Sequence, residues 1–190
     1  MQTYISILRG INVGGNRTIR MEDIREWYTG LGFKDVQSYI QSGNLVFTSD
    51  KQETAELESI ISRSILNHSQ LEVPVVVLGL DQLKLVVASN PFLLQPAISQ
   101  EGMHVTFLSA KPSQEGLARI MEMNHLPDQF LPVDKYVFLH CPNGYGKTRL
   151  TNNFFESKLN VTATTRNWRT LNELIRLAEK IDLPSVNQTP

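Results

Sequence analysis

The stretch DVQSYIQSGNLVFT, residues 35–48, decides the fold of this chain. Residues 35–40 and 44–48 are rich in β-branched and aromatic side chains, which predicts two short strands. Only Gln41, Ser42 and Gly43 lie between them, and so short a connection predicts a tight antiparallel hairpin. The elements on either side of this hairpin then determine the class of fold.

Strands and helices follow a regular order on both sides of the hairpin. Residues 3–9 predict a strand, and apolar residues at helical spacing predict a helix over residues 21–31. After the hairpin, Asp50 and Glu53 form a predicted capping box at the start of a second helix, and residues 73–78 predict a closing strand. The order is β-α-β-β-α-β, which is the ferredoxin-like pattern.

The same order of elements repeats in the second part of the chain. Its predicted elements are a strand at 103–109, a helix at 112–123, hairpin strands at 129–132 and 135–140, a helix at 148–158 and a strand at 161–165. A final helix starts with a predicted capping box at Thr170 and Glu173. We therefore expect an α+β protein of two tandem ferredoxin-like halves with an extra C-terminal helix. The expected divisions are residues 1–80 for the first half, 81–102 for a connecting helix (capped by Asp81) and linker, and 103–190 for the second half with the last helix.

Four stretches of the sequence resemble the bacterial family called domain of unknown function 1697. They are YISILRGINVGGN, LGFKDVQSYIQSGNLVF, PNGYGKTRL and TTRNWRTLNEL, and the resemblance covers essentially the whole chain. It implies two ferredoxin-like α+β halves and an activity that is unassigned. Members of that family typically carry serine and then lysine before the leucine of the third motif, where this chain has Thr148 and Arg149. Both exchanges keep a hydroxyl and a positive charge, although arginine presents a planar fork and lysine a point charge.

The composition is that of a globular protein with little overall charge. Hydrophobic residues make up 41% of the 190 residues, and the formal net charge is −1, which gives no general attraction to nucleic acid or membranes. Residues 147–176 carry six basic and two acidic side chains, a local excess of +4. The single cysteine, Cys141, excludes an intrachain disulfide. No apolar run is long enough for a membrane span and the N-terminus has no signal-peptide pattern, so we expect a cytoplasmic protein without membrane contact.

Topology predicts a first polar cluster at one end of the first sheet. The first two strands of a β-α-β-β-α-β unit run in the same direction, so the loop 9–16 and the hairpin turn lie at the same end. Glycines there allow close approach of the backbone to a ligand, and amide side chains can bind a carbonyl group or a base edge. The alternative is structural, with the polar groups satisfying one another in turns. The candidate ligand-binding residues are Arg9, Asn12, Gly14, Gly15, Gln41, Ser42 and Asn44.

A second polar cluster is expected in the second half. The segments after its third and fourth strands flank one central strand, roughly 10 Å apart. The candidates are Lys147, Thr148, Arg149, Arg166, Asn167 and Trp168. Free backbone N–H groups at a predicted helix start, together with Lys147 and Arg149, can hold an anion, whereas the alternative is an ordinary exposed loop. A true phosphate loop needs glycine five residues before Gly146, where Cys141 stands, so that motif is excluded.

Other chemistry finds little support in the sequence. The four histidines lack metal-ligand spacing, so neither a metal nor a cofactor is expected. His140 and Cys141 are adjacent on a predicted strand and point to opposite faces, which argues against a Cys–His nucleophile. Tyr136 and Phe138 share a strand face, as do the base-stacking aromatics of ferredoxin-like RNA-binding modules, but packing inside the protein is the favoured alternative.

Three hypotheses about function remain. The first, which we favour, is a protein that binds a small anionic or phosphorylated ligand through its polar loops, with a nucleotide or a nucleic acid as variants. The second is an enzyme of unknown reaction that uses the same polar groups. The third is an interaction module that forms a homodimer through an open sheet or an edge strand.

Overall fold

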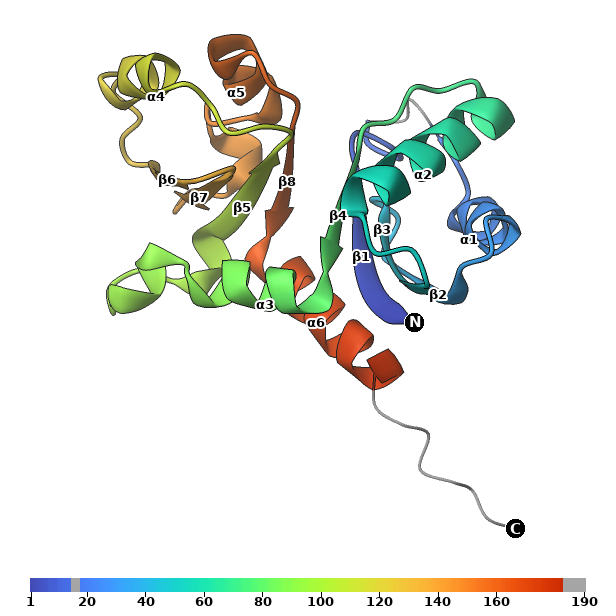
Figure 1. Cartoon of the computed structure of the whole chain (residues 1–190). Coiled ribbons are helices and arrows are strands. Elements are labelled where there is room, and N and C mark those ends of the chain that lie inside the picture. Colours follow the sequence, from blue (N-terminus) through green and yellow to red (C-terminus); the bar gives the residue numbers. More distant parts are fainter. Residues whose placement is uncertain (15–17, 183–190) are drawn as a thin grey trace. The chain divides into compact units, whose positions relative to one another are not determined.

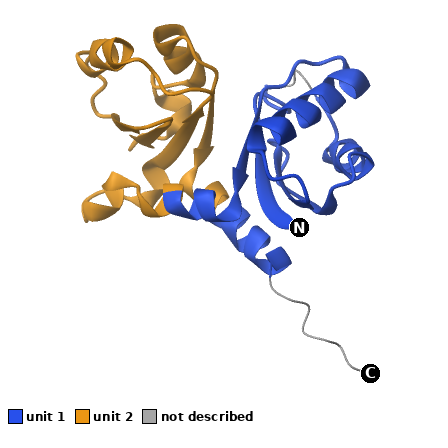
Figure 2. Ribbon diagram, in the orientation of Figure 1, with its two compact units in different colours: residues 1–85, 172–190 blue, residues 86–171 orange. Residues whose placement is uncertain are grey.

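A computed structural model describes residues 1–14 and 18–182 of the chain. Its described part is α+β, with two four-stranded antiparallel sheets and six α-helices. The described residues form two compact units, one of residues 1–85 and 172–182 and the other of residues 86–171 (Figure 2). The division differs from the expected one, because it falls inside two helices and assigns most of the last helix to the first unit.

The first unit is built on the sheet that contains the N-terminal strand. In chain order its elements are β1 (Gln2–Leu8), α1 (Met21–Gly30), β2 (Lys34–Tyr39), β3 (Asn44–Ser49), α2 (Thr54–Ser69) and β4 (Val75–Gly79) (Figure 1). The strands lie in the order β2-β3-β1-β4, so β1 is central and pairs antiparallel with both β3 and β4. The predicted strands and helices of the first half are all present, and no end is shifted by more than three residues.

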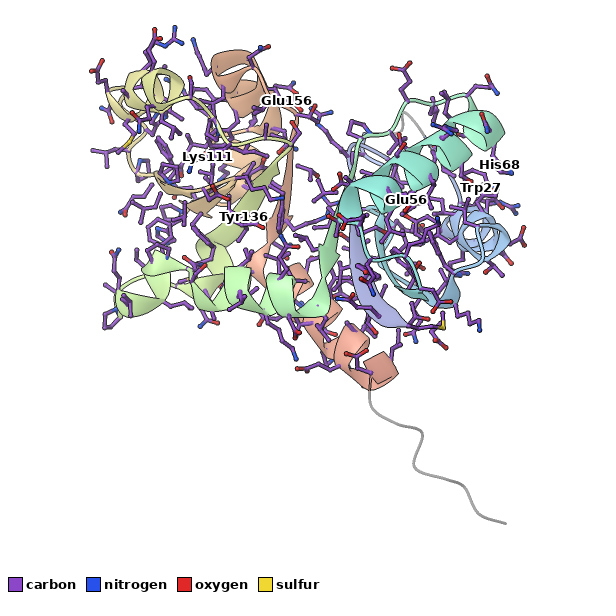
Figure 3. The ribbon with its side chains drawn as sticks, viewed as in Figure 1. Trp27, Glu56, His68, Lys111, Tyr136 and Glu156 are labelled. Carbon is purple, nitrogen blue, oxygen red and sulfur yellow. The ribbon has the colours of Figure 1, made fainter. Side chains whose placement is uncertain are left out.

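Helices α1 and α2 cover one face of this sheet. Trp27 of α1 stacks on His68 of α2, with ring centroids 4.9 Å apart (Figure 3). Beneath the helices, the alternating residues Tyr4, Leu45 and Phe47 face the core. Apolar side chains at helical spacing close that core from above, as the sequence pattern predicts. The fully buried helix residues are Ile24, Tyr28, Leu57, Ile61 and Ile65.

Two predicted helix caps of the first unit are wrong. Helix α2 begins at Thr54 after Glu53, and no side chain caps it. The Asp50 carboxylate lies 3.6 Å from the N-terminal amine instead, because β3 runs on to Ser49 and leaves Asp50 beside the chain start. Asp81 lies inside the first turn of α3 (Leu80–Ala88), since β4 leads into this helix with no intervening loop.

The expected linker is partly ordered into short 3₁₀ turns, η1 (Pro91–Leu94) and η2 (Gln100–Gly102). The buried Asn90 side chain accepts a hydrogen bond of 3.0 Å from the backbone N–H of Phe92. Phe92 is itself buried and lies against His140, with ring centroids 6.0 Å apart. This segment therefore packs as part of the second unit.

The second unit repeats the order of the first. It contains β5 (Met103–Leu108), α4 (Gln114–Met121), β6 (Gln129–Val133), β7 (Tyr136–His140), α5 (Asn152–Leu159) and β8 (Ala163–Asn167), followed by α6 (Trp168–Asp182) (Figure 1). The strands lie in the order β6-β7-β5-β8, and every neighbouring pair is antiparallel. Helix α4 begins after Ser113, whose side chain accepts from the backbone N–H of Gly116 at 3.1 Å.

The central strands of the second sheet, β5 and β7, are buried on both faces. Val137 and Leu139 belong to the core that also holds Phe155 of α5, whereas Phe138 points to the opposite face and is completely buried. The ring of Tyr136 contacts that of Phe107 edge to face, with centroids 5.8 Å apart. Phe138 is thus not presented to solvent for stacking on bases. Within the part of the chain that the structure describes, no helix is long and apolar enough to span a membrane.

Candidate functional site

The polar loops of the first unit adjoin one another, as their topology predicts. The backbone N–H of Leu8 donates to the carbonyl of Gly43 over 2.7 Å, and the Asn12 side chain donates to the carbonyl of Gln41 over 2.8 Å. Gly14 is exposed at the end of the described loop, and Gly15 lies outside the described residues. Sequence reasoning therefore placed this cluster correctly in the fold.

The amide side chains of this cluster are used to hold its loops. Asn12, in the left-handed backbone region with φ of 56°, binds both the N–H and the carbonyl of Ile19 at 2.8 Å, besides Gln41. Asn44 is completely buried, and its amide donates to the Tyr39 carbonyl at 3.2 Å and to the Ser42 hydroxyl at 3.0 Å. Arg9 is half-buried and Gln41 exposed. The geometry of Asn12 and Asn44 thus favours the structural role that the sequence left as an alternative.

The segment between β7 and α5 differs from its prediction. Helix α5 begins at Asn152, four residues later than expected, and Tyr145–Lys147 forms a separate 3₁₀ turn, η3. The Thr151 hydroxyl caps α5 by accepting from the backbone N–H of Phe154 at 3.2 Å. Lys147 therefore does not stand at the start of a helix, and the expected cradle of helix N–H groups around it is wrong.

The end of β8 also differs, because this strand runs two residues beyond its predicted end. Arg166 and Asn167 belong to the strand, and the buried Trp168 is the first residue of α6. The side-chain Oδ1 of Asn167 accepts from the backbone N–H of Thr170 at 2.7 Å, so Asn167 and not Thr170 caps this helix. One guanidinium nitrogen of Arg166 donates to the Thr164 hydroxyl at 3.1 Å and to the Thr165 carbonyl at 2.9 Å. Burial lowers the pKa of Arg166 to about 10, which leaves it charged at neutral pH.

Lys147 and Arg149 line a pocket of about 450 Å³ on the second unit. Their partners are not Arg166 to Trp168 but the loop between α4 and β6. The remaining lining residues, which sequence reasoning missed, are Asn124, His125, Leu126, Pro127, Asp128 and Asn143. The register of the β6–β7 hairpin pairs Gln129 with His140, so the segment before β6 and the segment after β7 start at the same edge of the sheet. The hairpin itself was predicted from the sequence. Its strand register would have been enough to infer that the two loops lie next to each other.

Thr148 ties the two walls of this pocket together. Its hydroxyl donates to the Asp128 carboxylate over 2.6 Å and accepts from the backbone N–H of Leu150 at 3.0 Å. Thr148 is buried, whereas Lys147 and Arg149 on either side of it are exposed. Successive side chains of residues 147–149 therefore alternate in direction. Thr148 points inward and anchors the segment, whereas the positively charged Lys147 and Arg149 point outward and line the pocket. Asp128 contributes the one negative charge among the described lining residues.

The loop 122–128 is held by its histidine. One ring nitrogen of His125 lies 3.0 Å from the Ile120 carbonyl, and the ring contacts Phe130 and Phe154 edge to face, with centroids 5.3 Å apart in each case. The backbone N–H of Asp128 donates to the His125 carbonyl over 2.9 Å. These contacts fix Asp128 in the position where Thr148 meets it.

Buried polar groups lie near the same end of the second sheet. His104 stacks on Tyr145, with ring centroids 5.0 Å apart, and its Nδ1 lies 3.0 Å from the Gly102 carbonyl. Burial, and to a lesser extent the charge of His140, lowers the pKa of His104, against the opposing effect of the Gly102 hydrogen bond. Burial raises the pKa of the Cys141 thiol to about 11, although its hydrogen bond with Thr148 acts in the opposite direction. Cys141 is therefore a protonated core residue at neutral pH and not a nucleophile.

Acidification is expected to destabilise the protein through His104. Because the folded state lowers this pKa below the ordinary value of 6.5, the unfolded state binds more protons as the pH falls through 6.5, and stability is lost there. The loss has a slope of at most about 1.4 kcal/mol per pH unit. Urea denaturation from pH 7.5 down to 5 should show a weaker pH dependence for His104→Gln than for the wild type. The variant His68→Gln, which removes an exposed histidine, is the control; equal slopes for His104→Gln and the wild type would contradict the assignment.

The described fold is α+β, and its second unit carries a surface pocket lined by two basic side chains and one acidic side chain. Residues 1–138 match the family described as "Protein of unknown function (DUF1697)", and the chain belongs to this family. The matched region includes the loop 122–128 and ends before Lys147 and Arg149. Comparison with curated proteins gave no match. Among solved structures, the chain is similar to a conserved bacterial protein, SP0830 from Streptococcus pneumoniae, with a TM-score of 0.69 and 21% sequence identity over 93% of this chain and 98% of that chain. This likeness shows the fold alone.

Proposed function

We propose that the protein binds a small anionic ligand, in particular a phosphorylated one, in the pocket lined by Lys147, Arg149 and Asp128. The observation that carries the proposal is the placing of two exposed cationic side chains on either side of a buried anchor, Thr148. Side chains held by an anchored backbone lose less freedom on binding, which favours affinity. The pocket volume of about 450 Å³ is in the usual range for small-molecule sites.

The charges of the lining side chains support an anion over a cation. Lys147 and Arg149 together outweigh Asp128, whose carboxylate already accepts the Thr148 hydroxyl. Arginine can bind two oxygens of a phosphate through its planar fork, and lysine adds a point charge.

We also propose that each unit is a ferredoxin-like half. The antiparallel orders β2-β3-β1-β4 and β6-β7-β5-β8, each with two helices between strands, support that assignment.

Loss of the two cations is expected to weaken anion binding by more than about tenfold. The test is calorimetric titration of the wild type and of Lys147→Ala/Arg149→Ala with inorganic phosphate and pyrophosphate at low salt. Lys111→Ala/Lys158→Ala is the matched control, because it removes the same charge from exposed positions of the same unit that do not line the pocket. Asp128→Asn keeps an acceptor for Thr148 but removes the negative charge, so it should tighten binding by about threefold to tenfold.

The comparison of variants decides the proposal. Equal weakening by the pocket variant and by the control would indicate general charge attraction, and no anion binding by the wild type would refute the site. Unfolding curves of each variant must match that of the wild type, since Lys147 and Arg149 are exposed and contribute little to the core.

A further inference from the structure

A second hollow is also lined by the loop 122–128. This hollow, of about 330 Å³, shares Asn124, His125, Leu126 and Asp128 with the pocket of Lys147 and Arg149. It adds Met123, Gln129 and Phe130. The two hollows therefore adjoin each other along a loop that His125 holds in place.

The two hollows differ in chemistry. Both cationic side chains lie in the first, whereas the second gains the apolar side chains of Met123 and Phe130. Leu126 lies at the boundary, and 78% of its surface is exposed; Met123 is 44% exposed. Apolar side chains that stand in water beside a site for ligands can bury further surface only when a ligand covers them.

We infer that the ligand is amphipathic, with an anionic group at Lys147 and Arg149 and an apolar arm over Leu126 and Met123. The inference rests on the proposed function, because the anionic group fixes the end from which the arm extends. Two observations favour one ligand that spans both hollows. Lys147 and Arg149 line one hollow whereas Met123 and Phe130 line the other, and four residues line both. The ring of His125, which contacts both Phe130 and Phe154 edge to face, provides a rigid base for both hollows.

A series of soluble n-alkyl phosphates tests the inference. Inorganic phosphate, methyl phosphate, butyl phosphate and hexyl phosphate are titrated into the full-length protein by calorimetry. We expect the affinity to rise by up to about fourfold for each methylene that becomes buried, until the hollow is filled. The variant Met123→Ser changes a residue that lines only the second hollow, so it should bind inorganic phosphate like the wild type but show a weaker dependence on chain length. Met123 is 44% exposed, so this variant is expected to fold.

The outcomes separate the inference from the proposed function. Binding of inorganic phosphate without dependence on chain length would overturn the amphipathic ligand and leave the anion site standing. Binding of no phosphate at all would remove both. Equal binding of hexanol and hexyl phosphate would also overturn the inference, because the anionic group would then contribute nothing.

Vesicles of phosphatidylcholine with phosphatidic acid distinguish the source of the ligand. Co-sedimentation with these vesicles, without binding of any soluble alkyl phosphate, would indicate a membrane surface and would contradict the small ligand.

Discussion

Phe47→Ala is expected to lower the free energy of unfolding by about 3–5 kcal/mol. Phe47 lies on β3 and is completely buried among three other aromatic rings. Its ring centroid is 4.5 Å from that of Phe33, 5.4 Å from that of Tyr28 and 5.8 Å from that of Tyr4. These rings come from β1, from α1 and from the turn before β2, so the cavity left by alanine would border three separate elements. Rigid elements close such a cavity only in part, which places the expected loss near the upper end for core residues.

Urea denaturation followed by circular dichroism and tryptophan fluorescence measures this loss. Phe47→Leu keeps most of the volume and should cost about 1–2 kcal/mol, since it forfeits mainly the ring contacts. Leu66→Ala on α2, where the leucine is 37% exposed, provides a surface control with a loss below about 1 kcal/mol. A loss for Phe47→Ala no larger than that of the control would mean that the aromatic cluster does not support the first unit.

Local patterns predicted the elements of both units, but not all of their ends. Strand β8 illustrates the limit. The β-branched run before Arg166 identified the strand, yet its end depends on β5, which pairs His104 with Asn167. A strand continues as long as its neighbour offers hydrogen bonds, and the length of the neighbour is a tertiary property. For the same reason Asn167 was expected beyond the strand and its role as the cap of α6 was missed.

The candidate site was predicted in part for a similar reason. Lys147 and Arg149 were identified from residue type, but their partners were sought at β8, and the structure places them with Asn124 to Asp128. That segment carries no recognisable motif. Its position follows from the hairpin of β6 and β7, whose register cannot be derived from propensity alone. Thr148 shows that residue type alone does not define the role of a side chain. Its hydroxyl was expected to bind a ligand, and it donates a hydrogen bond to Asp128 instead.

In the first unit, topology succeeded where residue chemistry was ambiguous. The direction of the strands was enough to bring the loop after β1 to the turn between β2 and β3. Whether Asn12 and Asn44 face a ligand or one another depends on side-chain rotamers and on buried backbone groups that need partners. Ile19 and Tyr39 supply such groups, and the two amides satisfy them. The glycine between Ser42 and Asn44 makes this close approach feasible.

Gly43→Ala is expected to cost about 2–5 kcal/mol of unfolding free energy. Gly43 has φ of +74°, where an L side chain is strained by roughly 1–2 kcal/mol. A Cβ at this position would also lie 2.7 Å from Cβ of Leu8 and 2.9 Å from two side-chain carbons of Ile11. Both neighbours are completely buried, so they cannot move aside without disturbing the core. Overpacking of this kind adds about 1–3 kcal/mol.

Two other glycines of the first unit separate these contributions. Gly32 has φ of +85° and open space around the position of a Cβ, so Gly32→Ala should lose only the conformational part, about 1–2 kcal/mol. Gly30, the last residue of α1, also has open space and needs no positive φ, so Gly30→Ala should be neutral or gain up to about 1 kcal/mol. Urea denaturation of the three variants should therefore rank them with Gly43→Ala the least stable, then Gly32→Ala, then Gly30→Ala. If Gly43→Ala and Gly32→Ala lose the same unfolding free energy, the contact of residue 43 with Leu8 and Ile11 is not tight. The hairpin turn can then shift away from the loop after β1. A larger loss for Gly43→Ala than for Gly32→Ala means instead that the hairpin turn and the loop after β1 can pack together only because residue 43 has no side chain. The hydrogen bonds of Asn12 and Asn44 then hold the two packed loops in place.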